Sequence, residues 1–401
     1  MQKKLIVVSL FNFLVAALMG LTLRYVYINP IDVNYGFLMH AHSHVAMLGW
    51  VYLALYVLIV HYFIPDKKPV FTRLFWFTEI AVIGMMLSFP IQGYAAISIS
   101  FSALHIFCSY YFAYLVWKHH KVNTLPTRYL LKASLIFMLL STIGVLSLGL
   151  IVAKLGSDAA LYQIAIQFFL HFQFNGWFLI AVLALFINQF QIQNIKLFKR
   201  FFVFLILATT FTLGLPVSWF AYHSFLLIIN GFGVLMQLLA LWYFIKLIQP
   251  FMNNFWSQIP KLLKLMYGFA ISNFILKIVL QSASIIPEIA HISHLYRNFV
   301  IGFIHLTMLG CVSGFLFAFL LQSVLANVKS TFLNLGIYSF ILGFLLTELL
   351  LFIQGLLFYF EIGMIPNYYL ILFISSIFLP LGIFIFLTQI VKHESKTTKT
   401  T

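Results

Sequence analysis

Histidines are the residues of this sequence best suited to do chemistry. There are thirteen of them against eight Asp plus Glu in 401 residues, although 63% of the residues are hydrophobic. Imidazole is the commonest metal ligand and a frequent haem ligand, and an ionisable side chain is costly to place in lipid without a partner. We therefore expect the histidines within apolar stretches to be ligands or to make specific hydrogen bonds.

Two of these histidines share a motif. HVAMLG within 40–50 and HLTMLG at 305–310 have the same spacing, His-x-x-Met-Leu-Gly. Two imidazoles at similar depth, each followed by a glycine that permits close approach, are what axial ligation of a flat macrocycle requires. This pattern predicts a haem held between His44 and His305, with Arg297 pairing with a propionate. The alternative is two unrelated polar residues packed inside a helix bundle.

A second group could hold a metal ion. His171 lies in LHFQFNGWF, and Tyr222 and His223 lie together in PVSWFAYHSF. Two imidazoles can bind copper or iron, but the ligand set is incomplete unless a third donor, such as Tyr222 or His105, joins them. Hydrogen bonding of His171 to a neighbouring helix is the alternative interpretation.

Apolar runs predict the elements that must position these residues. Because about 20 apolar residues cross a bilayer, the sequence predicts an all-α polytopic membrane protein with one transmembrane domain, 1–401. Charged residues make up 8% of the chain, which excludes an ordinary soluble fold. Twelve spans are expected, at 4–28, 38–64, 70–92, 94–118, 127–153, 158–189, 199–222, 224–248, 260–285, 296–325, 330–358 and 367–391.

Basic residues indicate the orientation of the spans. With the N-terminus inside, most lysines and arginines fall on the inner side, Lys118 and Arg128 among them, whereas the outer side has Arg24, Lys154 and Arg297. This asymmetry predicts that both termini are cytoplasmic. It also accounts for most of the net charge of +15 without a nucleic-acid partner, so the expected partner is the lipid bilayer.

Twelve spans with histidines in spans two, six and ten and at the outer end of span seven resemble subunit I of the haem–copper oxidases. The similarity is greatest to the cbb-type oxidases and nitric-oxide reductases. It implies a twelve-helix bundle of that type with a low-spin, b-type haem bound by His44 and His305. It further implies that His171 binds copper or non-haem iron, that an electron-donor subunit or quinol reduces the protein, and that the inner membrane of a bacterium contains it.

Three positions depart from the family pattern. Phe303 stands where the proximal histidine of the high-spin haem is expected, Tyr222-His223 replaces a histidine pair, and Asn175 replaces a glutamate. Because phenylalanine cannot ligate iron, we expect a retained low-spin haem and a degenerate active centre. An oxidoreductase activity of the terminal-oxidase or nitric-oxide-reductase type is expected only if that centre functions. Membrane haem proteins of the NnrS type are similar on the same residues.

Two other functions remain open from the sequence. One is a cofactor-free transporter or metal permease, in which outer histidines capture the metal and intramembrane charges couple transport: His40, His42 and His44, with Glu79, Lys277 and Glu348. The other is a non-catalytic subunit or assembly factor derived from an oxidase. The permease alternative does not explain the repeated His-x-x-Met-Leu-Gly motif.

Overall fold

Among the residues that the structure describes, twelve helical spans are long and apolar enough to cross a membrane, as the sequence predicts. The computed structural model describes residues 3–66, 68–190, 192–324 and 330–398, and every regular element in those ranges is a helix. The protein is therefore an all-α integral membrane protein. The predicted end of span ten at residue 325 lies outside the described residues.

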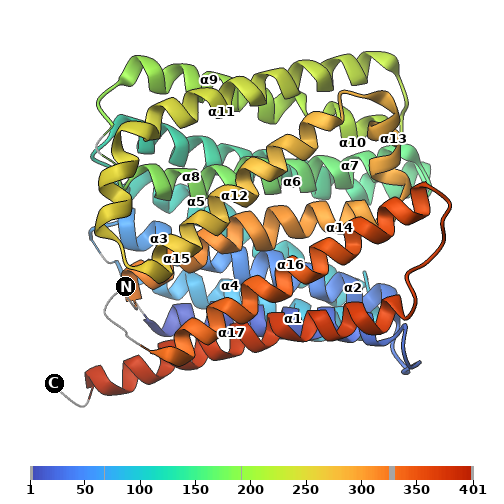
Figure 1. The fold of residues 1–401 in the computed structure, drawn as a ribbon, viewed down its shortest axis with the longest axis horizontal. Helices are drawn as coiled ribbons and strands as arrows, with labels where there is room; N and C mark the ends of the chain where they lie inside the picture. Colours follow the sequence, from blue (N-terminus) through green and yellow to red (C-terminus); the bar gives the residue numbers. More distant parts are fainter. Residues whose placement is uncertain (1–2, 67, 191, 325–329, 399–401) are drawn as a thin grey trace. The chain divides into compact units, whose positions relative to one another are not determined.

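The chain divides into two compact units, and the prediction of a single domain stays a prediction. The first unit runs up to Lys121 and resumes at Leu316, and in it α16 and α17 lie side by side (Figure 1). Its helices are α1 Lys3–Tyr25, α2 Tyr35–His44, η1 Val45–Tyr52, α3 Leu53–Phe63, α4 Pro69–Gln92, α5 Ala96–His119, most of α15 Gly314–Val324, α16 Thr331–Tyr359 and α17 Tyr368–Thr398.

The second unit runs from Val122 to Phe315, and in it α9 packs along α11. Its helices are α6 Leu125–Leu155, α7 Ala160–His171, η2 Phe172–Phe178, α8 Leu179–Ile187, α9 Ile195–Phe211, α10 Gly214–Ser218, α11 Ser224–Gln258, α12 Lys261–Ala283, α13 Pro287–Leu295, α14 Arg297–His305 and η3 Leu306–Ser313. The elements labelled η are π-helical.

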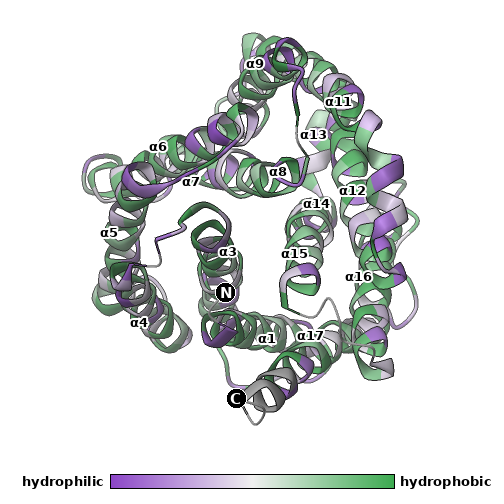
Figure 2. Ribbon diagram, turned by 90° about the vertical axis from the view of Figure 1, so that its left-hand side faces the viewer, coloured by the Kyte–Doolittle hydropathy of each residue, from purple (hydrophilic) through white to green (hydrophobic). Residues whose placement is uncertain are grey.

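The exposed faces of the spans are apolar. Ile91, Leu150 and Ile228 are 80, 68 and 68% exposed, and most of the helical ribbon in Figure 2 has the colour of hydrophobic residues. A soluble protein rarely exposes apolar area on this scale. Because lipid offers no hydrogen bonds, the backbone groups of these segments must be paired within the helices themselves. The surface composition thus matches a bilayer environment.

Spans two, six and ten, numbered along the chain, are much more buried than the others. Span two is Tyr35–Phe63, span six is Ala160–Ile187 and span ten is Arg297–Val324. In their most apolar 18-residue windows, 72, 89 and 83% of the residues are buried, against 28–50% in the other nine described spans. Every fourth span is therefore a core element, and these are the spans in which the sequence places His44, His171 and His305.

Two predicted boundaries near prolines differ from the structure. Span eight was expected to stop at 248, yet α11 continues through Pro250 to Gln258. Span seven was expected to reach 222, yet α9 ends at Phe211 and a short helix, α10, follows around Pro216. Because proline lacks a backbone N–H, Pro216 interrupts the helical hydrogen-bond ladder of span seven.

The loop between spans nine and ten contains a further helix, α13, which packs on the end of span seven. Trp219 Nε1 donates to the carbonyl oxygen of Ala290 at 3.3 Å, and the His294 ring stacks on Trp219 with centroids 4.8 Å apart. Partial burial, followed by the proximity of His291, lowers the pKa of His294 below 6.5. The neutral imidazole is therefore the form that the packed helix favours.

We predict that packing of α13 weakens in acid. A histidine with a lowered pKa contributes its full packing stability above the unperturbed pKa of 6.5, and that stability falls as the pH drops below this value. Hydrogen exchange of residues 287–295, corrected for intrinsic rates, should increase between pH 7 and pH 5. The control variant His294→Gln removes this imidazole and keeps the other nearby titratable or charged groups, Glu288, His291 and Arg297. If hydrogen exchange of α13 depended equally on pH in the wild type and in His294→Gln, His294 would not be the group responsible.

Candidate functional site

Three π-helical segments occur among the described residues, and each begins directly after a histidine. His44 precedes η1, His171 precedes η2 and His305 precedes η3. π-Helical turns are rare, and they occur frequently at functional sites. The structure thus distinguishes these three histidines from the other ten by the local backbone that follows each of them.

A glycine occupies the same position in all three segments. Gly49, Gly176 and Gly310 each lie five residues after the histidine, and the residues that follow them, Trp50, Trp177 and Cys311, are fully buried. The signal His-x-x-x-x-Gly is therefore visible in the sequence at all three places. At His44 and His305 it is contained in the longer His-x-x-Met-Leu-Gly motif, whereas at His171 only the histidine and the glycine are shared.

The glycine of η1 lets neighbouring helices approach closely. A Cβ on Gly49 would lie 2.8 Å from Cγ1 of Val82 and 3.1 Å from Cβ of Asn12. Asn12 donates through Nδ2 to the carbonyl oxygen of Gly49 at 3.2 Å and to Oε2 of Glu79 at 2.8 Å. A side chain of α1 therefore satisfies a backbone carbonyl within the π-helical segment of span two and links it to an acid on α4.

His44 has the geometry of a metal-binding imidazole. Its Nδ1–H donates to the carbonyl oxygen of His40 at 2.8 Å, which fixes the tautomer and leaves Nε2 as the atom able to ligate. Metal-bound histidines characteristically donate their other ring N–H in this way. The half-buried ring lies against Phe89 and Tyr94, with centroids 4.4 and 5.8 Å away. These features fit an axial ligand of a haem.

His305 occupies the corresponding place along its own span. Asn34 caps α2 by accepting the N–H of Phe37, so span two begins at Tyr35 and His44 follows nine residues later. Span ten begins at Arg297, and His305 follows eight residues later. At about 1.5 Å per residue, the two histidines lie about 14 and 12 Å along their helices. From the predicted span starts at 38 and 296, the positions of His44 and His305 along their spans differ by three residues. In the structure they differ by one.

Arg297, the residue predicted to pair with a haem propionate, is the exposed first residue of α14. It precedes His305 on the same helix, and its position at the end of the span is where a propionate partner is expected. Phe303 is half-buried on α14, and its carbonyl oxygen accepts from the hydroxyl of Thr307 at 2.8 Å. The phenyl side chain offers no ligand, as the sequence indicates.

His42 makes contacts different from those of His44, whereas His40 lies against the same two rings, Phe89 and Tyr94. The His42 Nδ1–H donates to the carbonyl oxygen of Ala16 at 2.8 Å, and its ring packs where a Cβ on Gly20 would lie, 2.8 Å from Cε1. The His40 ring contacts Tyr94, with centroids 4.7 Å apart. Because His42 and His44 bond to carbonyl oxygens on different helices, the three histidines do not converge on one point.

His171 is buried and hydrogen-bonded within the second unit. Its Nε2–H donates to the carbonyl oxygen of Thr209 at 2.7 Å, so only Nδ1 could bind a metal. Lys277, a buried cation, acts on it electrostatically. Within the described ranges, no three His, Cys, Asp or Glu side chains are placed to share a metal ion. The predicted binding of copper or non-haem iron by His171 therefore stays a prediction, with Nδ1 as its ligand atom.

Tyr222 and His223 lie in the turn between α10 and α11. Tyr222 is 77% exposed, and His223 caps α11 by accepting the N–H of Phe225 at its Nδ1, 3.2 Å away. The predicted extension of span seven to residue 222 was wrong, so this pair is outside the helical span. Its predicted metal-binding role stays a prediction.

Comparison with known proteins adds no family to these observations. No protein-family model matches the chain, and no curated protein matches it in sequence. Functional assignment therefore depends on the three histidines, the segments that follow them and their hydrogen bonds.

We predict that Gly176→Ala destabilises the protein. An added Cβ would lie 2.6 Å from Cβ and Cγ of Phe137, so α6 must move away from η2, at a cost of about 1–3 kcal/mol. Thermal unfolding of the detergent-solubilised protein should show a lower Tm. Gly149→Ala in α6 is the matched control, since its added Cβ meets nothing within 4 Å and should leave Tm unchanged or higher. Equal Tm values for both variants would contradict the packing described.

Proposed function

We propose that this protein is a membrane haem protein in which His44 and His305 are the axial ligands of a low-spin, b-type haem. The carrying observation is that each histidine is followed by an eight-residue π-helical segment with Met, Leu and Gly at the same places. The two residues belong to different compact units, so the proposal is supported by the surroundings of each one separately. The fixed tautomer of His44 is the second support.

The proposed role is electron transfer. A haem with two imidazole ligands exchanges electrons but offers a gas no open position on its iron. The hydrogen bond from His44 to the carbonyl oxygen of His40 orients the ring and makes Nε2 a better donor. Phe303, which offers no ligand for a second haem iron, favours electron transfer over reduction of oxygen or nitric oxide. An electron-donor subunit or quinol is the proposed partner.

We also propose that both termini face the cytoplasm of a bacterium and that the protein lies in its inner membrane. The distribution of lysine and arginine supports this orientation. Within the first unit, Lys121 follows span four and contacts the loop after span two, where it pairs with Asp66 at 3.4 Å and its N–H donates to the carbonyl oxygen of Phe63 at 2.9 Å. Two loops predicted to share the inner side therefore lie together.

The permease alternative has less support. It requires His40, His42 and His44 to capture one metal ion, whereas His42 bonds to α1 and His44 bonds within its own helix. No observation in the described residues favours this arrangement over haem ligation.

Absorption spectra of purified variants test the proposal. Protein from haem-replete cells should show a Soret band and a sharp reduced α band, and both should be lost in His44→Ala and His305→Ala because each variant removes an axial ligand. His42→Gln and His171→Leu are matched controls that remove a half-buried or buried histidine elsewhere, and they should keep the spectrum. A colourless wild-type preparation, or loss of haem in the controls alone, would refute the assignment.

A further inference from the structure

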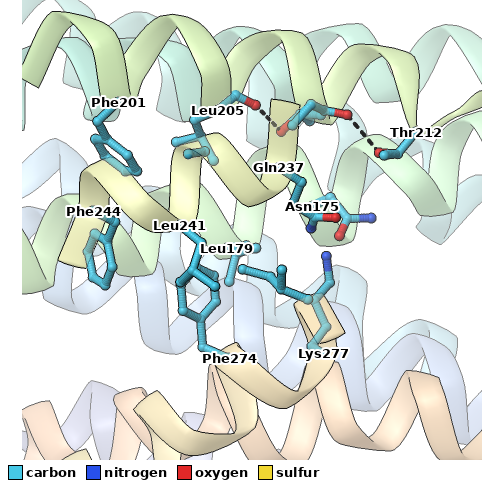
Figure 3. A pocket seen from close by; sticks show the side chains of 14 residues that line it. Asn175, Leu179, Phe201, Leu205, Thr212, Gln237, Leu241, Phe244, Phe274 and Lys277 are labelled. Atoms are coloured by element: carbon cyan, nitrogen blue, oxygen red, sulfur yellow. Dashed lines mark hydrogen bonds between the residues drawn. The ribbon is translucent and has the colours of Figure 1, made fainter. Parts of the chain in front are cut away.

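A small cavity with both apolar and polar walls lies in the second unit. Its volume is about 20 Å³, and Figure 3 shows the side chains of Lys277 and Asn175 pointing toward one another across it, with Gln237 nearby. Aromatic and aliphatic residues, including Phe244 and Leu179, form the rest of the lining. A cavity of about 10–15 Å³ or more can hold a water molecule if polar partners surround it.

Lys277 supplies a hydrogen-bond donor to this cavity. The side chain is 1% exposed, and its Nζ donates to Oε1 of Gln281 at 2.9 Å. An ammonium group has three donors, so this bond leaves it able to donate further. A buried charge costs much less when it is fully hydrogen-bonded, so an acceptor within the cavity would stabilise Lys277.

Gln237 supplies an acceptor whose orientation is fixed by its neighbours. Its Nε2 donates at 3.2 Å to the same Oε1 of Gln281 that accepts from Lys277. Exchanging the oxygen and nitrogen of Gln237 would bring two oxygens together. The buried Oε1 of Gln237 therefore points elsewhere, and it has no hydrogen-bond partner.

Asn175 supplies a second acceptor, fixed in the same manner. Its Nδ2 donates to the carbonyl oxygen of His171 at 3.2 Å, so the amide cannot be reversed without opposing two oxygens. Its Oδ1 is buried without a partner. Two amide oxygens of cavity-lining residues thus require a donor, and the ammonium beside them can still donate.

We propose that this cavity binds one water molecule, which accepts a hydrogen bond from Lys277 and donates one to Asn175 and one to Gln237. A water has two donors and lone pairs to accept, so it satisfies all three groups, and three is the usual number of hydrogen bonds for a buried water. An anion would face two amide oxygens, and a metal cation would face the ammonium. The occupant is therefore neutral.

This water completes the hydrogen bonding of the Lys277 ammonium beside span six. Asn175 connects it to the carbonyl oxygen of His171, the residue from which η2 begins. The hydrated ammonium of Lys277 then places a positive charge near His171. This charge would repel a metal ion bound at His171. The water site does not depend on haem binding, so it can fail or hold independently of the proposed function.

A structure of the full-length protein at about 2 Å resolution tests the site directly. The expected result is a density peak within about 2.6–3.2 Å of Lys277 Nζ, Asn175 Oδ1 and Gln237 Oε1, the normal hydrogen-bond range. An empty cavity, or Lys277 bonded directly to both amide oxygens with no space left, would overturn the proposal.

Thermal unfolding of a variant series gives a second test. Lys277→Met removes the donor to the water and to Oε1 of Gln281 and so weakens the water's hold on both amide oxygens, and Tm should fall by several degrees. The triple variant with Lys277→Met, Asn175→Leu and Gln237→Leu also removes both amide oxygens that need a donor, so it should recover part of the loss even though Oε1 of Gln281 loses its two donors. Asn230→Leu, a buried asparagine of α11 bonded to Ser284, is the control and should add its own loss to that of Lys277→Met. A triple variant as unstable as the sum of its three single variants would overturn the proposal.

Discussion

Backbone amides and carbonyls within a bilayer must find their partners inside the protein, because the hydrocarbon core supplies none. This constraint makes the α-helix the default for all twelve spans and makes any departure from it costly. The three π-helical segments are such departures, and all of them lie in the three most buried spans. There, other parts of the protein can compensate, as Asn12 does for the carbonyl oxygen of Gly49.

The departures have a common form. A histidine ends a stretch of α-helix, a π-helical segment follows, and a glycine five residues on permits close approach of a neighbouring helix, as Val82 and Phe137 show for Gly49 and Gly176. The histidines that begin these segments make different hydrogen bonds. His44 retains a nitrogen able to ligate, whereas His171 uses its Nε2 on Thr209 and lies near a buried lysine.

Much of the fold could be predicted from hydropathy alone, since about 20 apolar residues define a span. The errors came at prolines: α11 continues through Pro250, where a helix end was expected, and span seven breaks before Pro216, where a continuous helix was expected. The motif shared by His44 and His305 was also visible in the sequence, and the local structure repeats at both. The π-helical segments were not predictable from periodicity, because a segment of seven or eight residues is too short to show a distinct period. Nor could the sequence reveal that His171 bonds to Thr209, a contact between residues far apart in the chain.

Axial ligation of a haem by two histidines is the central claim. Near-infrared magnetic circular dichroism of the oxidised, purified protein reports axial ligands directly, because the energy of the porphyrin-to-iron charge-transfer band depends on the ligand pair. The account predicts the band of a bis-imidazole haem in the wild-type protein. A protein without haem, or a band typical of histidine–methionine ligation, would contradict it.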